Sequence, residues 1–204
     1  AMMHCLVGSE MCIRDSNRPE GVMCIKERPW QGLYADGITT LDFERGKAAS
    51  ILEEPWQTDD SIGSWGYNPS KPYMTPDLVV DKLIDIVSKN GNMLLNIPIK
   101  ADGTLDAEAT TLLQDVGKWF AVNGEAIYGT RPWYMYGEGR NEIGHHDLES
   151  KMTAKDFRYT TKGDVLYAFV LDWPRYGRNP VVFPNLVKMN TRVTEVTSVK
   201  LLGY

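Results

Sequence analysis

The strongest constraint on the fold lies in residues 75–124, where two amphipathic helix patterns flank an apolar run. The first pattern begins at Thr75, whose hydroxyl suits an N-cap, and Pro76 suits the first helical position. Apolar residues then recur at helical spacing until the pair Asn90-Gly91, which tolerates the left-handed backbone of a helix end. These residues predict a helix with clear boundaries.

The residues that follow this helix repeat the alternation of element types. The apolar run 93–99 predicts a strand buried on both faces. Asp106 can then cap a second helix, which the pair Asn123-Gly124 is expected to close. Strand and helix in alternation predict an α/β fold with a parallel sheet.

After Pro132 the pattern changes to short alternating segments. Residues 157–160 and 165–173 are separated by a short turn, and a further segment spans 192–202. These segments predict antiparallel β structure. The polar, glycine-containing sequence at 134–150 predicts a loop, which supports a domain boundary near residues 130 to 150. These strands are too few for a complete β-sandwich, so we expect a partial β-sandwich.

Residues 1–16, AMMHCLVGSEMCIRDS, have neither helical nor strand periodicity and lack the order of a signal peptide. Residues 6–16 resemble the translation of a transposase adapter used in DNA library preparation. We therefore interpret residues 1–16 as an artefactual leader and exclude them from the fold prediction. Its alternative is a genuine flexible leader. If the adapter interpretation holds, the true N-terminus of the parent protein is missing.

Charge and cysteine content exclude several functional classes. The formal net charge is -5, from 22 basic and 27 acidic residues, so nucleic acid is not an expected partner. No run approaches the roughly 18 to 20 apolar residues of a membrane-spanning helix. The three cysteines, Cys5, Cys12 and Cys24, fit neither a disulfide framework nor a zinc site. The sequence carries no signal for an oligomeric state.

Residues 42–67 combine carboxylates with aromatic rings in an irregular stretch. The carboxylates are Asp42, Glu44, Glu53, Glu54, Asp59 and Asp60, and the rings besides Phe43 are Trp56, Trp65 and Tyr67. Indole rings pack against the flat apolar faces of sugars, and carboxylic acids protonate glycosidic oxygens. This stretch is a candidate site for carbohydrate chemistry, with a solvated acidic loop as the alternative.

Three segments in order identify a family resemblance. They are PWQTDDSIGSWGYNP at 55–69, LVVDKLIDIVSKNGNMLLNIPIKADGTL at 78–105 and VGKWFAVNGEAIYGTRPW at 116–133. Together they resemble the later part of the catalytic domain of α-L-fucosidases of glycoside hydrolase family 29. The resemblance runs from about Asn17 to Trp133 and continues more loosely through the β-rich tail.

The resemblance implies a fold and an activity. Residues 17–133 are expected to form the C-terminal part of a (β/α)8-like catalytic barrel, and residues 134–204 a partial antiparallel β-sandwich. The family removes terminal α-L-fucose from glycans with retention of configuration, using an aspartate nucleophile and a glutamate acid/base. No cofactor and no metal are implied, and the expected partner is a fucosylated glycan. The resemblance also suggests a periplasmic or secreted bacterial protein.

The resemblance implies a role for Glu44, which lies in DFER where the bacterial branch of the family places its general acid/base. Burial beside Trp56 or Trp65 would raise its pKa usefully for this role. The alternative is an exposed loop glutamate paired with Arg45. Glu53 and Glu54 remain open as alternative acid/base residues, because the position of this residue varies across the family. Gln57 cannot be the acid/base, because it is an amide where some relatives have glutamate.

Two further residues match sugar-binding positions of the family. Trp65, in SWGY, matches the aromatic ring that lines the pocket around the sugar's apolar edge and methyl group, and its alternative role is a barrel core residue. Arg18, in NRPEG, matches an arginine that reaches the bound sugar, and the five donors of a guanidinium suit hydroxyl groups. We assign substrate binding to both.

Nothing in the chain matches the family's nucleophilic aspartate or its sugar-binding histidines. His145 and His146 follow the expected barrel and are not assigned to the site. One carboxylate of the required pair is therefore absent, and we expect the isolated chain to be inactive. Two non-catalytic alternatives remain: a carbohydrate-binding module built on the β-rich tail, and a catalytically inactive barrel relative that acts as a scaffold.

Overall fold

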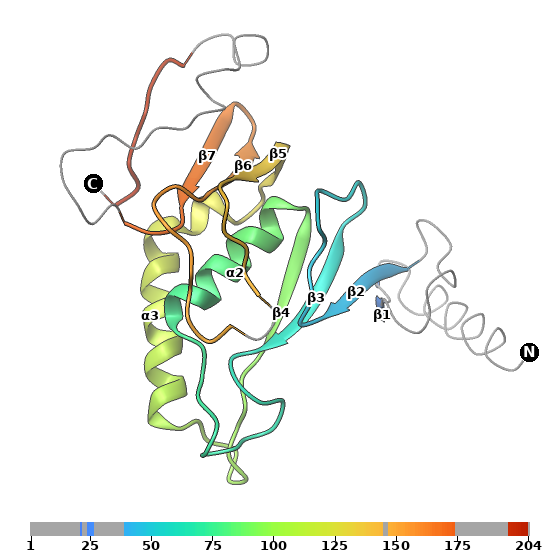
Figure 1. Cartoon of the computed structure of the whole chain (residues 1–204), viewed down its shortest axis with the longest axis vertical. Coiled ribbons are helices and arrows are strands. Elements are labelled where there is room, and N and C mark those ends of the chain that lie inside the picture. Colours follow the sequence, from blue (N-terminus) through green and yellow to red (C-terminus); the bar gives the residue numbers. More distant parts are fainter. Residues whose placement is uncertain (1–20, 22–23, 27–38, 145–146, 174–195, 204) are drawn as a thin grey trace, which may run out of the picture.

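The computed structural model describes residues 21, 24–26, 39–144, 147–173 and 196–203. Figure 1 shows a parallel sheet, the helices α2 (Pro76–Ser88) and α3 (Ala107–Asn123) beside it, and a smaller antiparallel sheet on the far side of α2. The expected leader at 1–16, Arg18, His145 and His146 lie outside the described residues.

The parallel sheet has four strands whose spatial order follows their order in the chain. They are β1 (Cys24–Lys26), β2 (Thr40–Glu44), β3 (Trp56–Ser61) and β4 (Gly91–Asn96). All three pairings are parallel, as the alternation of elements predicted. A parallel sheet of this kind is compatible with part of a barrel.

Both helices begin where their capping residues predicted. Helix α2 (Pro76–Ser88) joins β3 to β4, and the Thr75 side chain accepts a hydrogen bond from the Leu78 amide at 3.3 Å. Helix α3 (Ala107–Asn123) follows β4, and the Asp106 carboxylate accepts from the Ala109 amide at 2.8 Å. Each cap satisfies a backbone donor that has no partner inside the helix.

The two helices end differently. Helix α2 is followed by Asn90 with φ of 72°, which confirms the expected left-handed residue. Gly124, in contrast, has φ of −59° and continues into the 3-10 turn η1 (Gly124–Ala126). The left-handed residue comes later, at Gly129 with φ of 69°, because the extra turn delays the change of direction.

Strand β4 differs from the sequence prediction in its bounds and in its burial. It begins at Gly91 and ends at Asn96, and Leu94 is 59% exposed. Leu94 pairs with Asp59, on the sheet face away from α2. The expectation of burial on both faces was therefore wrong, since only one face packs against the helix. An apolar run alone does not reveal what covers its second face.

The antiparallel sheet has three strands in the order β5-β6-β7. These are β5 (Arg131–Glu138), β6 (Phe157–Lys162) and β7 (Val165–Val170). Strands β6 and β7 confirm the expected antiparallel pair, which turns at Gly163 with φ of 57°. The loop predicted at 134–150 instead begins with the later part of β5, whose pairing with β6 supplies backbone partners that local polarity does not reveal.

The further strand predicted at 192–202 is absent from its described part. Residues 196–203 contain no strand, and 192–195 lie outside the described residues. Alternating apolar residues predict a strand only where a neighbouring strand pairs with them. Within the described parts of the chain, no helix is both long and apolar enough to cross a membrane.

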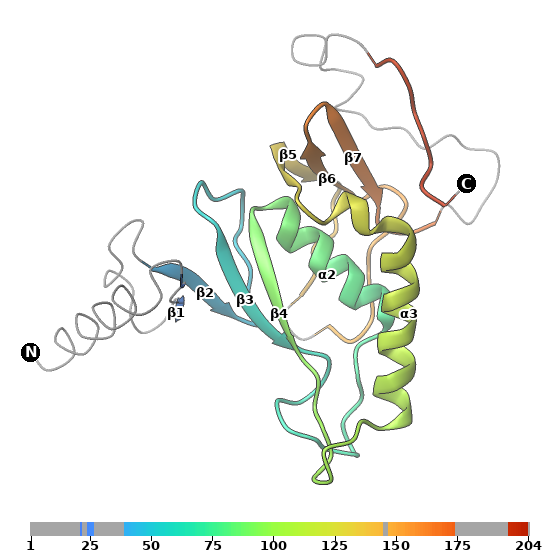
Figure 2. The same cartoon turned by 180° about the vertical axis from the view of Figure 1, so that it is seen from behind.

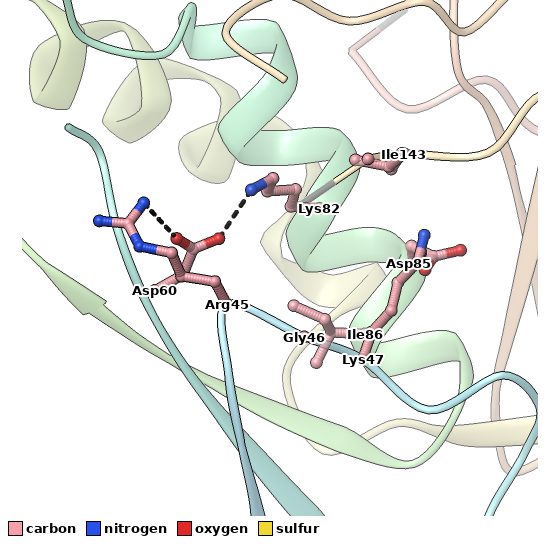
Figure 3. A pocket seen from close by; sticks show the side chains of 9 residues that line it. Arg45, Gly46, Lys47, Asp60, Lys82, Asp85, Ile86 and Ile143 are labelled. Atoms are coloured by element: carbon pink, nitrogen blue, oxygen red, sulfur yellow. Dashed lines mark hydrogen bonds and ion pairs between the residues drawn. The ribbon is translucent and has the colours of Figure 1, made fainter. Parts of the chain in front are cut away.

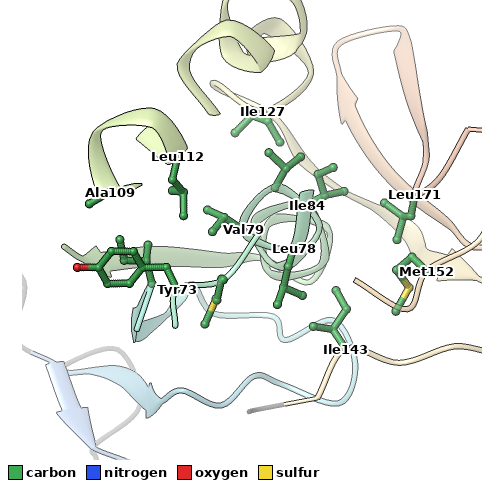
Figure 4. Packing of buried hydrophobic residues seen from close by; sticks show 13 residues of the cluster. Tyr73, Leu78, Val79, Ile84, Ala109, Leu112, Ile127, Ile143, Met152 and Leu171 are labelled. Carbon is green, nitrogen blue, oxygen red and sulfur yellow. The ribbon is translucent and has the colours of Figure 1, made fainter. Parts of the chain in front are cut away.

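One hydrophobic core joins the two sheets through α2. Figures 1 and 2 show α2 between the parallel sheet and the antiparallel sheet, with α3 alongside. Figure 4 shows Leu78 and Ile84 of α2 near Leu112 of α3 and near Leu171, which follows β7. A second, smaller cluster lies between α2 and the sheet, where Ile86 packs with its aromatic neighbours.

Candidate active site

The carboxyl ends of the parallel strands meet at one edge of the sheet. Strands β2, β3 and β4 end there at Glu44, Ser61 and Asn96. The Asn96 amide donates to the Ser61 hydroxyl at 2.9 Å and to the Trp65 carbonyl at 3.0 Å. These bonds hold the turn that follows β3 against this edge. The sheet therefore brings Glu44 and Trp65 to the same edge.

Glu44 is the last residue of β2, rather than a loop residue, and its side chain is exposed. In the ladder it pairs with Asp59, which pairs in turn with Leu94. Paired residues of neighbouring strands point to the same side of a sheet. The carboxyl group of Glu44 therefore lies on the sheet face opposite to α2.

Trp56, one of the two indoles considered as a neighbour of Glu44, lies away from it. The Trp56 side chain is fully buried on the α2 side of the sheet, edge-on to Phe43 at 5.2 Å between ring centroids. Its indole nitrogen donates to the Lys89 carbonyl at 2.9 Å. Side chains alternate between the two faces along a strand. Trp56 lies three residues from the ladder partner of Glu44, so the two side chains point to opposite faces of the sheet.

Glu53 and Glu54 lie at the other edge of the sheet. They precede β3, from which only Pro55 separates them, and both are exposed. The Asn90 side chain donates to the Leu52 carbonyl at 3.1 Å and to the Glu53 carbonyl at 2.9 Å. These bonds tie the segment to the turn before β4, where the amino ends of the strands lie. Of the three candidate carboxylates, Glu44 is the one on the edge that carries Trp65.

Trp65 presents its ring near the surface, with 42% of its area exposed. The Arg45 guanidinium lies over this ring, 4.6 Å from the centroid. Arg45 also donates to the Gly63 carbonyl at 2.7 Å and to the Asp60 carboxylate at 3.4 Å. In the described residues part of this ring is open to a ligand, and its assignment to sugar binding stays a prediction. Arg18, the second expected sugar-binding residue, lies outside the described residues.

A cation that sequence reasoning missed lies on the same sheet face as Glu44. The Lys26 ammonium is 3.2 Å from Asp42 and also bonds Asp59. Partial burial lowers the pKa of Lys26, but the two carboxylates outweigh it and raise the pKa. This sheet face thus carries the Lys26 ammonium together with the carboxylates of Asp42, Asp59 and Glu44. No sequence pattern indicated this cluster, because Lys26 comes from a three-residue strand.

Figure 3 shows a pocket on the other side of the sheet, between the segment after β2 and helix α2. It is lined by Arg45, Gly46, Lys47, Asp60, Lys82, Asp85, Ile86, Ile143 and Gly144. Its carboxylates are already paired: Asp60 with Lys82 at 2.7 Å, and Asp85 with Lys47 at 3.3 Å. The pocket therefore holds structural ion pairs and lies away from Glu44.

The residues along α2 did contain a signal for these ion pairs. Lys82, Asp85 and Lys89 are spaced three and four residues apart, which places them on one helix face. Asp85 also binds Arg158 of β6, and a contact between residues so distant in the chain has no local signature. Among the described residues, no group of three or more histidine, cysteine or acidic side chains could hold a metal ion.

Comparisons with known proteins identify a family for this chain. The Alpha-L-fucosidase family model matches residues 7–125. An α-L-fucosidase of Branchiostoma floridae is 35% identical over 166 residues, which cover 79% of this chain and 32% of that protein. The solved structure of Thermotoga maritima α-fucosidase in complex with fucose has a TM-score of 0.58 at 27% identity, covering 76% of this chain and 32% of the other.

A further solved α-L-fucosidase has a TM-score of 0.66 at 26% identity, covering 83% of this chain and 36% of the other. The chain therefore spans about a third of the length of the curated relatives that it matches. The matched relatives are α-L-fucosidases, which are glycoside hydrolases.

Proposed function

The chain belongs to the α-L-fucosidase family, and from this premise we propose that it forms the later part of a retaining exo-α-L-fucosidase. Its four parallel strands would be part of a (β/α)8-like barrel, and its antiparallel sheet part of a β-sandwich. Glu44 would be the general acid/base, with Trp65 and Arg18 in contact with the sugar. The substrate would be terminal α-L-fucose on a glycan.

One observation carries this proposal: Glu44 and Trp65 lie at the carboxyl edge of the parallel sheet. Barrel enzymes place their active sites at this edge, on side chains that follow the strands. A carboxyl group and an aromatic ring are also the two groups that glycoside hydrolysis needs beside a sugar. Glu53 and Glu54 lack this support, because they precede β3 at the opposite edge.

The chemistry would proceed in two steps. In the first, the Glu44 carboxyl group donates its proton to the glycosidic oxygen as the bond from that oxygen to the anomeric carbon breaks, while an aspartate carboxylate attacks this carbon. In the second, the Glu44 carboxylate accepts a proton from a water molecule that attacks the same carbon and releases the aspartate. Two inversions give net retention of configuration. No cofactor takes part in either step.

The aspartate of this scheme would come from an earlier barrel strand. Nothing within residues 17–204 matches it, so we propose that the purified chain does not hydrolyse fucosides. The described part of the sheet is also open on the face that carries Glu44, where Leu94 is exposed. In a closed barrel, further strands would cover this face and bring the second carboxylate opposite Glu44.

The test uses an extended chain, in which the upstream coding sequence recovered from the source DNA replaces residues 1–16. We expect this chain to release fucose and the 204-residue chain to release none. Glu44→Gln should slow hydrolysis of an alkyl fucoside, whose poor leaving group needs the proton, by about 100-fold or more. An aryl fucoside with an acidic leaving group should lose much less in the first step.

Glu54→Gln is the matched control, because it removes an exposed carboxylate of the same stretch at the other edge of the sheet. It should leave both substrates close to the unsubstituted rate. Equal activity of Glu44→Gln and the parent chain on the alkyl fucoside would refute the assignment. Turnover by the 204-residue chain would refute its proposed inactivity.

A further inference from the structure

Arg45 directly follows Glu44 and has an unusual backbone. Its φ is 52°, in the left-handed region that few residues other than glycine adopt. Its amide donates to the Asp59 carbonyl at 2.8 Å. Such a conformation persists only where surrounding contacts hold it, and residues of this kind cluster at functional sites. The chain therefore leaves β2 in a fixed direction immediately after the proposed acid/base.

The side chain of Arg45 connects this point to the turn after β3. Its guanidinium stacks over the Trp65 ring at 4.6 Å and donates to the Gly63 carbonyl at 2.7 Å. A guanidinium suits both contacts at once, since its plane can stack on a ring while its N–H groups point outward in that plane. One side chain thus holds both the backbone and the ring of this turn.

The contacts of Arg45 continue to helix α2. Asp60 accepts from Arg45 at 3.4 Å through one oxygen and from the Lys82 ammonium at 2.7 Å through the other. The side chains of Asp60 and Lys82 are only 4% and 6% exposed. Figure 3 shows Asp60 between the two cations. Because α2 lies in the main core, Asp60 is a fixed anchor for Arg45.

We propose that Arg45 is a positioning residue of the fucoside site, which fixes the Trp65 ring relative to Glu44. The proposal rests on the proposed function of Glu44 and Trp65. Arg45 points away from the open sheet face, so it acts through Trp65 rather than on the sugar. Loss of its stacked guanidinium leaves a ring that is 42% exposed without this support. Sugar binding should then weaken more than proton transfer.

The first test needs no catalytic activity and uses the 204-residue chain. The indole N–H signal of Trp65 in a nitrogen-15 spectrum is assigned with Trp65→Phe. Arg45→Gln removes the charge and the stacked plane, and it should move and broaden this signal. The Trp56 indole, bonded to the Lys89 carbonyl at the amino end of β3, is the internal control and should keep its position.

Arg45→Lys is the second variant, because it keeps the charge beside Asp60 but lacks the planar group. It should also displace the Trp65 signal, and it remains informative if Arg45→Gln fails to fold. Asp115→Asn, in an exposed pair on α3, is the matched surface control and should change neither indole. An unchanged Trp65 signal in folded Arg45→Lys would overturn the proposal.

The second test measures kinetics in the extended chain. Arg45→Lys should raise KM for an aryl fucoside by about 2- to 30-fold, the range expected for the loss of one cation–π contact, with a smaller change in kcat. A lower kcat at constant KM would overturn the positioning role. If the parent extended chain shows no turnover, the proposed function fails. The spectroscopic test would still show whether Arg45 fixes the Trp65 ring, because it needs no activity.

Discussion

Asp85 shows how a single residue joins distant elements. Its side chain has no exposed surface, and it is bonded by Arg158 at 2.6 Å, Lys89 at 2.8 Å and Lys47 at 3.3 Å. Burial alone would raise the pKa of Asp85, but the three cations hold it below the ordinary value. Asp85 is therefore ionised in the folded protein. It links the segment after β2, helix α2 and strand β6.

Removing the charge of Asp85 should be strongly destabilising. Asp85→Asn leaves three cations facing one another with little access to water, and breaking a buried ion pair in this way costs about 3–5 kcal/mol. The measurement is the free energy of unfolding in urea. Asp115→Asn is the control, because its pair with Lys118 is exposed and should contribute little. Similar losses in the two variants would contradict this account.

Asp81 has the opposite electrostatic environment. Burial, together with the nearby Asp77, raises its pKa from 3.8 to about 7, although the Ser150 hydroxyl donates to its carboxylate and opposes the rise. A raised pKa in the folded state means that protonated Asp81 favours folding. Its contribution is fully present below about pH 4 and is lost as the pH rises through 7.

Asp81→Asn should remove this dependence, because an amide stays neutral and can still accept from Ser150. A rise in pKa from 3.8 to about 7 corresponds to about 4 kcal/mol. The variant should therefore gain stability over the parent chain as the pH rises from 4 to 8, by up to that amount. Urea unfolding of both chains at several pH values measures the difference. Parallel curves would show that Asp81 ionises normally.

At the scale of elements, two glycines differ in the space available for a side chain. A Cβ at Gly91, the first residue of β4, would lie 2.5 Å from an atom of the Trp56 ring and 2.7 Å from a methyl carbon of Ile86. Trp56 is fully buried and cannot retreat. A Cβ at Gly117, inside α3, would meet no atom within 4 Å.

The same substitution should therefore have opposite signs at the two sites. Gly91→Ala overpacks the junction of α2 and β4 and should cost about 1–3 kcal/mol. Gly117→Ala should stabilise α3 by about 0.5–1 kcal/mol, because alanine loses less backbone freedom in a helix. Thermal unfolding of both variants measures the two shifts. A stable Gly91→Ala would mean that strand and helix can separate there.

Local signals predicted the starts of the elements better than their surroundings. Thr75 and Asp106 indicated both helix starts because a cap acts within a few residues. The exposure of Leu94 and the strand β5 were missed because both depend on neighbours distant in the chain. The turn at Gly163 was found, since a hairpin is a local structure.

For the candidate site, too, local motifs indicated the residues but not their contacts with distant parts of the chain. Glu44 and Trp65 came from a family resemblance carried by short motifs, and their common edge follows from the parallel order of the strands. Arg45 was considered only as a partner of Glu44, whereas its side chain reaches Asp60 and Trp65. Its left-handed backbone has no signal in the residue type, because arginine rarely adopts that conformation.

At the scale of the whole molecule, the two sheets depend on each other. Helix α2 packs on both, and the main core combines residues of α2 and α3 with Met152 and Leu171 from the antiparallel part. Across the same junction, Arg158 binds Asp85, and the Tyr136 ring faces Lys89 at 4.6 Å. The described parts should therefore unfold together rather than as separate domains.

This dependence predicts the outcome of cutting the chain after residue 130. Residues 1–130 would lose Arg158 from Asp85 and would expose the apolar side of α2 that Leu171 and Met152 cover. In their described part, residues 131–204 would keep three strands without a helix to pack on, too little for independent stability. We expect neither piece to give a cooperative urea transition or the near-ultraviolet circular dichroism of packed aromatic rings.

A chain cut after Trp173 is the control, because it keeps every described strand and both helices. It should unfold in one transition, with the same midpoint by tryptophan fluorescence and by far-ultraviolet circular dichroism. The comparison also decides between the alternatives for the β-rich tail. A folded, glycan-binding piece 131–204 would favour a separate carbohydrate-binding module. An unfolded piece would indicate that the tail is stable only when it packs on α2. Its role would then be to cover α2 and so to stabilise the sheet that carries Glu44.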